Sequence, residues 1–263
     1  MDETTSRGQG GPLPEGVRTL LVTGGGRGIG AAVAELAARR GYAVCVNYRR
    51  DAGSAQAVVR RIREAGGQAM AAAADVASEP DVMRLFGEID AAWGRIDALV
   101  NNAGMLEKQM RLVDMDAARM RRILDANTVG TMLCAREAVR RMSTRLGGRG
   151  GAIVNVSSAA ARWGSPGEYV DYAASKGAVD TFTVGLSREV GGEGIRVNAV
   201  RPGAIDTTMH ADGGEPGRIA RLAPGIPLGR GGTVDEVAGA VLWLLSDEAA
   251  YTTGSFIDIA GGK

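Results

Sequence analysis

The 263-residue chain contains one histidine, His210, and two cysteines, Cys45 and Cys134. With so few of these ligands, no zinc or other metal site is expected, and a Ser-His-Asp triad could use only His210. Both cysteines lie in apolar segments, which indicates buried thiols in a reducing compartment rather than a disulfide framework. The sequence therefore predicts a cytoplasmic protein without a metal centre.

The chain also lacks an excess of either charge and lacks long apolar runs. Its 31 Lys and Arg residues balance 30 Asp and Glu residues, for a formal net charge of +1, so nothing favours nucleic-acid binding through bulk electrostatics. No apolar stretch approaches the roughly 18 residues of a membrane span. Residues 1–16 have no apolar core segment and are rich in Gly and Pro. They are expected to form a disordered tail rather than a signal peptide.

From residue 17 onwards, apolar strand-like segments alternate with helical patterns. This alternation predicts an α/β fold: one domain over residues 17–263 with a doubly wound, parallel, seven-stranded sheet of the Rossmann type and helices on both faces. Ligands of such sheets bind at the carboxyl ends of the strands. Strands are expected at 17–23, 42–48, 68–75, 96–104, 151–158, 195–200 and 254–260, and helices at 28–40, 52–65, 80–93, 116–146, 169–190 and 233–246.

A glycine-rich turn, residues 23–30, joins the first strand to the first helix. Glycines let the backbone approach a pyrophosphate, and the helix N-terminus offers free N–H groups and a favourable dipole. The spacing G-x-x-x-G-x-G departs from the standard G-x-G-x-x-G fingerprint, so a flexible turn with fortuitous glycines is the alternative. The strand before it and the helix after it favour a dinucleotide-binding loop. Its expected contacts are Gly24, Arg27, Gly28, Ile29 and Gly30.

The end of the second strand reads Asn-Tyr-Arg-Arg at residues 47–50 and has no acid before Asp51. An acid at this point would bond the ribose 2′-hydroxyl of NAD. Arg27 and Arg49 could instead clamp a 2′-phosphate, although both could also be ordinary surface arginines. The sequence therefore favours NADP(H), with NAD(H) as the alternative. The contacts expected from this strand end are Asn47, Tyr48 and Arg49.

Tyr172 and Lys176 stand four residues apart in an expected helix, so they share one face. Lysine is scarce, with three against 28 arginines, and arginine does not replace a compact ammonium. An adjacent ammonium stabilises the phenolate and lowers the pKa of a tyrosine from about 10. An exposed helix face with an unrelated Tyr and Lys is the alternative. Ser158, at the end of the fifth strand, could donate to a substrate oxygen, and Asn127 alone is interpreted as structural.

These motifs follow one another in a characteristic order, which ends with Pro202-Gly203. Together they resemble the classical short-chain dehydrogenase/reductase family from about residue 17 to the C-terminus. The branches most similar are the 3-oxoacyl-carrier-protein reductases and the glucose dehydrogenases. The motifs are Thr23-Gly24-x-x-x-Gly28-x-Gly30, Asn101-Asn102-Ala103-Gly104, Asn127, Ser158 and Tyr172-x-x-x-Lys176.

The resemblance implies a role for each of these residues. Tyr172 would exchange a proton with a carbonyl or alcohol, and Ser158 would bond the same oxygen. Lys176 would lower the Tyr172 pKa and bind the nicotinamide ribose, and Asn127 would hold a water linking Lys176 to solvent. Hydride would move to or from the cofactor. The resemblance also implies a homo-tetramer and cofactor contacts at Asp75, Val76, Asn102, Ala103, Gly104, Pro202, Gly203, Ile205 and Thr207.

Some features leave alternatives open. The interval from Ser158 to Tyr172, 14 residues, is slightly longer than is usual in the family, and a loop insertion at 165–171 would explain it. The segment 203–222 corresponds to the substrate lid, where His210 is either a substrate contact or an exposed loop residue. An NADP(H)-binding regulator without turnover is the alternative function, which the complete catalytic set disfavours. The arginines expected on a solvated helix face are Arg136, Arg140, Arg141 and Arg145.

Overall fold

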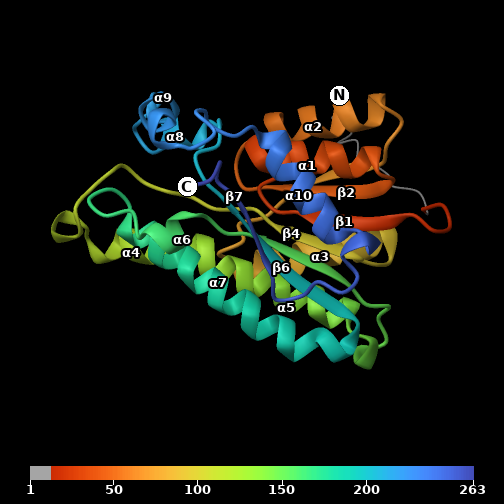
Figure 1. Ribbon diagram of the computed structural model, residues 1–263. Coiled ribbons are helices and arrows are strands. Elements are labelled where there is room, and N and C mark those ends of the chain that lie inside the picture. The colour runs from red at the N-terminus through yellow and green to blue at the C-terminus, as the bar shows by residue number, and fades with distance from the viewer. Residues whose placement is uncertain (1–12) are drawn as a thin grey trace, which may run out of the picture.

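The computed structural model describes residues 13–263, apart from the side chains of His210 and Asp212. Seven parallel strands form one sheet in the order β3-β2-β1-β4-β5-β6-β7, in a single domain (Figure 1). This confirms the predicted doubly wound fold. The strand order reverses between β1 and β4, which creates the ligand-binding crevice of such sheets. The strands are β1 (Arg18–Val22), β2 (Tyr42–Tyr48), β3 (Ala69–Ala73), β4 (Ala98–Asn101), β5 (Gly151–Val156), β6 (Ile195–Pro202) and β7 (Phe256–Ile259).

Helices cover both faces of the sheet and bury two separate apolar layers (Figure 1). One layer lies beneath α1 (Gly28–Arg39), α2 (Ala52–Glu64) and α10 (Val234–Leu245). The other lies beneath α3 (Glu79–Trp93), α5 (Gly130–Met142) and α7 (Val170–Val190). The remaining α-helices are short: α4 (Ala117–Leu124), α6 (Ala160–Trp163), α8 (Met209–Asp212) and α9 (Arg218–Leu222).

The central strands are largely apolar because both faces of the sheet are covered by helices. Leu20 and Val22 of β1 point into one layer, and Leu21 between them points into the other. This alternation is the two-residue period of a strand. A strand covered on both faces reads as a continuous apolar run, which is why the sequence pattern located β1 and β2 well.

The prediction of one continuous helix at 116–146 is wrong, because the helix is broken in the middle. A π-helical turn, η2 (Asp125–Val129), separates α4 from α5. The side chain of Asn127 bonds the main chain of Met105, and Thr128 Oγ1 donates to the main-chain oxygen of Ser175. These contacts to other segments replace the regular helical pattern. Such π-turns occur often at functional sites.

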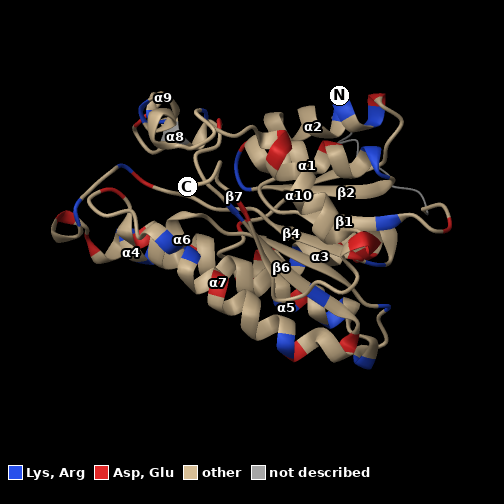
Figure 2. Ribbon diagram, in the orientation of Figure 1, with Lys and Arg blue, Asp and Glu red and all other residues tan. Residues whose placement is uncertain are grey.

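The arginines of α5 form a partly solvated ion-pair cluster rather than an open charged face. Arg136, Arg140 and Arg141 all pair with Glu137, which is only 4 % exposed. Arg141 also pairs with Asp90 of α3. The cluster therefore ties α5 to α3. Charged residues elsewhere lie mostly on loops and the outer sides of helices (Figure 2).

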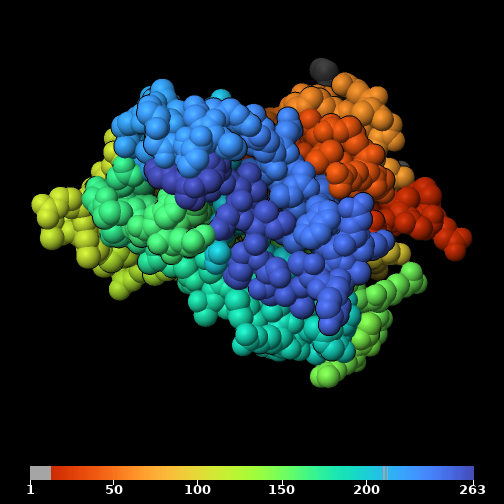
Figure 3. Space-filling model, viewed as in Figure 1, coloured from red at the N-terminus to blue at the C-terminus, as the bar shows by residue number. Residues whose placement is uncertain are grey.

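The segment 203–232, which includes the lid segment 203–222, contains α8 and α9. It packs on the C-terminal residues (Figure 3): the amide of Leu228 donates to the main-chain oxygen of Gly261. Figure 1 shows α8 and α9 above the carboxyl ends of the strands. The segment therefore covers the edge of the sheet at which ligands are expected.

Candidate active site

The glycine loop after β1 takes a conformation that requires glycine. Gly24 and Gly28 have φ angles of +61° and +55°, in the left-handed region that side chains disfavour. A Cβ on Gly30 would lie 2.5 Å from both the Asn102 side-chain nitrogen and the Gly24 oxygen. Arg27, at the N-cap of α1, makes no side-chain capping bond. The first N–H groups of α1 therefore point toward a site that can hold an anion.

Two asparagines fix the glycine loop. Asn102 Nδ2 donates to the main-chain oxygens of Thr23 (2.9 Å) and Gly24 (3.0 Å). Asn47 Oδ1 accepts from the amide of Gly24 (3.2 Å), and its Nδ2 donates to the oxygen of Ala74 (3.1 Å). Asn47 is 2 % exposed. The polar atoms of its side chain thus bond the protein backbone. Asn47 also lines the cavity described next, so its contact with a cofactor stays a prediction.

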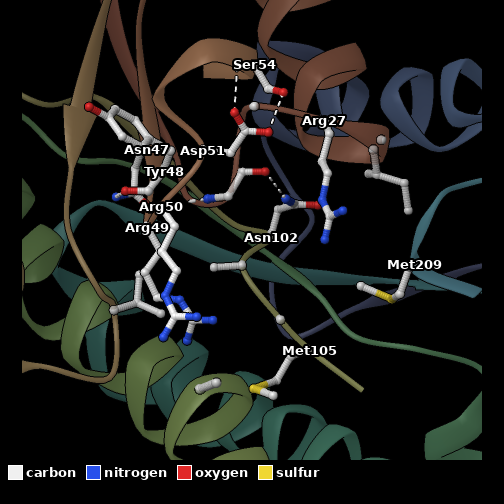
Figure 4. A pocket seen from close by; sticks show the side chains of 18 of the residues that line it. Arg27, Asn47, Tyr48, Arg49, Arg50, Asp51, Ser54, Asn102, Met105 and Met209 are labelled. Carbon is white, nitrogen blue, oxygen red and sulfur yellow. Dashed lines mark hydrogen bonds between the residues drawn. The ribbon is translucent and has the colours of Figure 1, made fainter. Parts of the chain in front are cut away.

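A cavity of about 420 Å³ adjoins this loop. Arg27 reaches it from the start of α1, and Arg49 and Arg50 extend into it from the end of β2 (Figure 4). Arg49 Nη1 lies 3.7 Å from Asp75 Oδ2. Sequence reasoning did not select Arg50, although it directly follows Arg49. Other predicted residues that line this cavity are Gly24, Gly28, Ile29, Asn47, Tyr48, Asp75, Val76, Asn102, Ala103, Gly104 and Thr207.

A second cavity of about 130 Å³ contains three of the four predicted catalytic groups. Ser158, at the end of β5, lines it together with Tyr172 and Lys176 of α7. The predicted residues Pro202, Gly203 and Ile205 also line it. The two cavities adjoin, because Ile29, Asn102, Gly104, Thr207 and Met209 line both of them.

Burial controls the electrostatics of Tyr172 and Lys176. Lys176 is 4 % exposed, its Nζ donates to the main-chain oxygen of Val156 (2.8 Å), and it lies 5.8 Å from the Tyr172 ring centroid. Burial lowers the pKa of Lys176 to about 8, with Asp180 opposing. Desolvation raises the pKa of Tyr172, and a hydrogen bond from Ser158 opposes the rise. The protein groups alone therefore do not produce the lowered Tyr172 pKa expected from the sequence, because desolvation outweighs the hydrogen bond with Ser158.

Asn127 is fully buried beside this centre. Its Oδ1 accepts from the amide of Met105 (2.8 Å), and its Nδ2 donates to Ser175 Oγ (3.0 Å). A Cβ placed on Gly104 would lie 3.4 Å from Asn127 Oδ1 and 3.5 Å from Lys176 Nζ. Asn127 thus fixes the strand-end loop next to Lys176, and its implied role of holding a water stays a prediction.

Ser157 lines the same cavity as Ser158, but its hydroxyl is bonded to α7. Its Oγ donates to Asp180 Oδ1 (2.6 Å), and Arg201 Nε donates to Asp180 Oδ2 (2.9 Å). This trio supports α7 from behind Lys176, because Ser157 Oγ also contacts the main-chain oxygen of Lys176. Sequence reasoning missed Asp180 and Arg201, since nothing in the chain order joins them to Ser157.

Two further residues belong to the lid side of the second cavity or lie near it. Trp163 lines this cavity and is 40 % exposed. His210 belongs to α8 by its backbone, but its side chain lies outside the described part of the chain.

Comparisons with known proteins agree with this geometry. Residues 24–263 match the family model described as enoyl-(acyl carrier protein) reductase. The chain belongs to the short-chain dehydrogenase/reductase family. It is similar to the uncharacterized oxidoreductase YgfF of Escherichia coli (strain K12), with 58 % identity over 92 % of this chain and 98 % of that protein. It is therefore an oxidoreductase of this family.

Two more relatives carry informative names. A 3-oxoacyl-[acyl-carrier-protein] reductase of Synechocystis sp. is 38 % identical over 93 % of this chain and 96 % of that protein. A short chain dehydrogenase from Burkholderia cenocepacia J2315, crystallised in complex with NADP, is 33 % identical. It superposes with a TM-score of 0.84 and covers 93 % of this chain and 97 % of that chain. The architecture is thus that of solved members of the family.

Across residues 13–263, no helix is long and apolar enough to cross a membrane. Among the side chains that the structure describes, no group of three or more His, Cys, Asp or Glu residues could hold a metal ion.

Proposed function

We propose that the protein interconverts a carbonyl compound and its alcohol with NADP(H) as cofactor. One observation carries the proposal: the cavity on the glycine loop adjoins the cavity that contains Tyr172. A dinucleotide whose pyrophosphate binds at the start of α1 would present its reactive ring beside Tyr172. The homo-tetramer implied by the family resemblance stays a prediction.

The residues at the loop fit a dinucleotide. Gly30 packs so closely against Asn102 and Gly24 that it leaves no room for a side chain. Dinucleotide-binding loops require such close packing between the loop and the helix. Arg27, Arg49 and Arg50 line the cavity, and guanidinium groups bind phosphate through charge-assisted bonds. These three arginines support a 2′-phosphate, and hence NADP(H). NAD(H) is the alternative cofactor.

The chain's own residues supply the acid–base chemistry, while a bound nicotinamide supplies or accepts the hydride. Tyr172 donates a proton to the carbonyl oxygen in reduction and accepts one in oxidation. Ser158, which bonds Tyr172, orients the same oxygen. Lys176 would bind the cofactor ribose and stabilise the phenolate, and Asn127 holds the Met105 backbone beside it.

The test is a fluorescence titration of the purified protein with NADPH and NADH, followed by a panel of neutral and charged carbonyl compounds with nucleotide oxidation as readout. We expect tight NADPH binding, weaker NADH binding, and turnover with at least one carbonyl. Preference for NADH would overturn the 2′-phosphate site. Binding without any turnover would favour a cofactor-binding regulator, and failure to bind either nucleotide would overturn the proposal.

A further inference from the structure

One arginine of the lid segment 203–222 reaches the second cavity. Arg218 of α9 lines that cavity, its side chain is 13 % exposed, and its guanidinium lies 5.1 Å from the centroid of the Tyr169 ring. Leu222, one helical turn later, lines the same cavity. Helix α9 therefore forms one wall of the space in front of Tyr172.

Two carboxylates neutralise Arg218. Its Nη2 donates to Glu168 Oε2 (2.6 Å), from the loop before α7, and its Nη1 donates to Glu215 Oε2 (2.9 Å). Arg221 bonds the same two carboxylates. We call these four residues the clasp. Acidic and basic groups are intermingled around α8 and α9 in Figure 2.

All four clasp residues are charged at neutral pH. Burial would raise the pKa of Glu168, but Arg218 and Arg221 outweigh it and hold that pKa below its usual value. Hydrogen bonding from Arg221 lowers the pKa of Glu215 to about 2. The two positive and two negative charges of the clasp therefore cancel. Both terminal nitrogens of Arg218 are bonded to carboxylates.

The other cations near the cavity are also engaged. Lys176 bonds the main-chain oxygen of Val156. Lys263 lies outside the lining, with its Nζ 5.3 Å from the centroid of the Trp163 ring. The described lining is otherwise dominated by apolar and aromatic side chains, namely Ile29, Leu106, Trp163, Tyr169, Met209 and Leu222.

The cavity is also small. Its volume of about 130 Å³ is close to that of an engineered apolar cavity of about 150 Å³ that binds benzene. A nicotinamide ring bound beside Tyr172 would occupy part of this space, which favours a compact substrate. A charged group carried into it would lose its hydration, and a carboxylate would find Arg218 already paired with Glu168 and Glu215.

We infer that the substrate is a compact, uncharged, largely apolar carbonyl compound, and that the clasp excludes anionic substrates by neutralising Arg218. This inference rests on the proposed oxidoreductase function. An anionic competitor is thereby denied a partner for its charge, which is one means of specificity.

The test compares two ketones that share one ring: cyclohexanone and 4-oxocyclohexanecarboxylate. For the unaltered protein we expect kcat/KM to favour cyclohexanone by about tenfold or more. Glu168→Gln keeps the size of the side chain but removes one of the two negative charges that neutralise Arg218. It should shift the kcat/KM ratio toward the keto acid by about fivefold or more. Glu215→Gln should shift it in the same direction and provides a second reading if Glu168→Gln folds poorly.

Glu35→Gln is the matched control. It breaks an equivalent pair, Glu35 with Arg61 (2.7 Å), between residues that do not line the second cavity, so the ratio should not move. A preference of the unaltered protein for the keto acid, or turnover only of other carbonyl compounds, would overturn the inference and leave the proposed function standing. An unchanged ratio in both clasp variants would overturn the role of the clasp. If no carbonyl compound reacts, the proposed function itself fails.

Discussion

The ammonium group of Lys176 donates a 2.8 Å hydrogen bond to the main-chain oxygen of Val156, the last residue of β5. This bond ties the second turn of α7 to the strand that leads into Ser158. Ser158 and Tyr172 therefore face the same cavity. The bond also keeps the lysine buried, which lowers its pKa to about 8.

The lowered pKa of Lys176 makes stability depend on pH. The folded state holds this proton less tightly than the unfolded state, whose lysine pKa is 10.5. The stabilising contribution is therefore complete above pH 10.5 and is lost as the pH falls through about 8. Relative to Lys176→Met, the unaltered protein should gain roughly 3 kcal/mol of unfolding free energy between these values. Urea unfolding of both proteins at several pH values measures this, and parallel curves would contradict it.

Lys176→Met should also abolish most turnover, because methionine can neither bind the ribose nor stabilise the phenolate. Steady-state kinetics at pH 7 test this alongside the unfolding series. A variant that is stable yet nearly as active as the unaltered protein would remove Lys176 from the mechanism.

The two arginines at the end of β2 should set nucleotide preference. Arg49→Ala and Arg50→Ala should each raise the Kd for NADPH by about tenfold, because a guanidinium–phosphate bond is lost. The Kd for NADH should change little. Arg60→Ala, an exposed arginine of α2, is the matched control. Equal changes in the affinities for both nucleotides would refute a 2′-phosphate site at this position.

A buried ion pair anchors the start of the catalytic helix. Arg119 and Asp171 are 4 % and 5 % exposed, and Arg119 Nε donates to Asp171 Oδ2 (2.7 Å). Asp171 Oδ1 accepts from the amide of Tyr172 (2.9 Å). Arg119→Met should cost about 3–5 kcal/mol of unfolding free energy, because it leaves a buried charge unpaired. Adding Asp171→Asn, which keeps an acceptor for Tyr172, should recover part of the loss.

Urea unfolding of the two single variants and the double variant forms a mutant cycle for this pair. Strictly additive losses would show that Arg119 and Asp171 do not interact energetically, contrary to the geometry.

The two cysteines should be unreactive in the folded protein. Cys45 and Cys134 are both 0 % exposed. Burial raises the pKa of Cys134 to about 12 and that of Cys45 further, and the thiol form is a poor nucleophile. Iodoacetamide at pH 8 should label neither cysteine in the native protein and both in urea, as read by mass spectrometry. Rapid labelling of the native protein would contradict this packing.

The fold was well predicted from the sequence because its signals are local. Six strands lie within the predicted ranges, and β6 extends two residues past its predicted end. Apolar runs and glycine turns carry that information within a few residues. The break in the helix predicted at 116–146 depends on bonds from Asn127 to Met105 and Ser175. Such contacts between distant segments leave no periodic trace in the sequence.

The site was predicted as far as its motifs extend. The glycine loop and the Tyr172–Lys176 spacing located the two adjoining cavities. The pairs Glu168–Arg218 and Arg119–Asp171 join residues about fifty positions apart, so no local pattern announces them. Helical spacing shows that Tyr172 lies near an ammonium group, but it does not show the burial that raises the Tyr172 pKa.

The central claim is that Tyr172 exchanges the proton. Tyr172→Phe removes only the phenolic oxygen, and Tyr251→Phe, at a fully exposed tyrosine, is its control. The decisive measurement is kcat of both variants on an accepted carbonyl compound, together with the Kd for NADPH. The account predicts that Tyr172→Phe loses about 10³-fold in kcat while NADPH still binds, and that Tyr251→Phe is unaffected. Near-normal turnover by Tyr172→Phe would contradict the account.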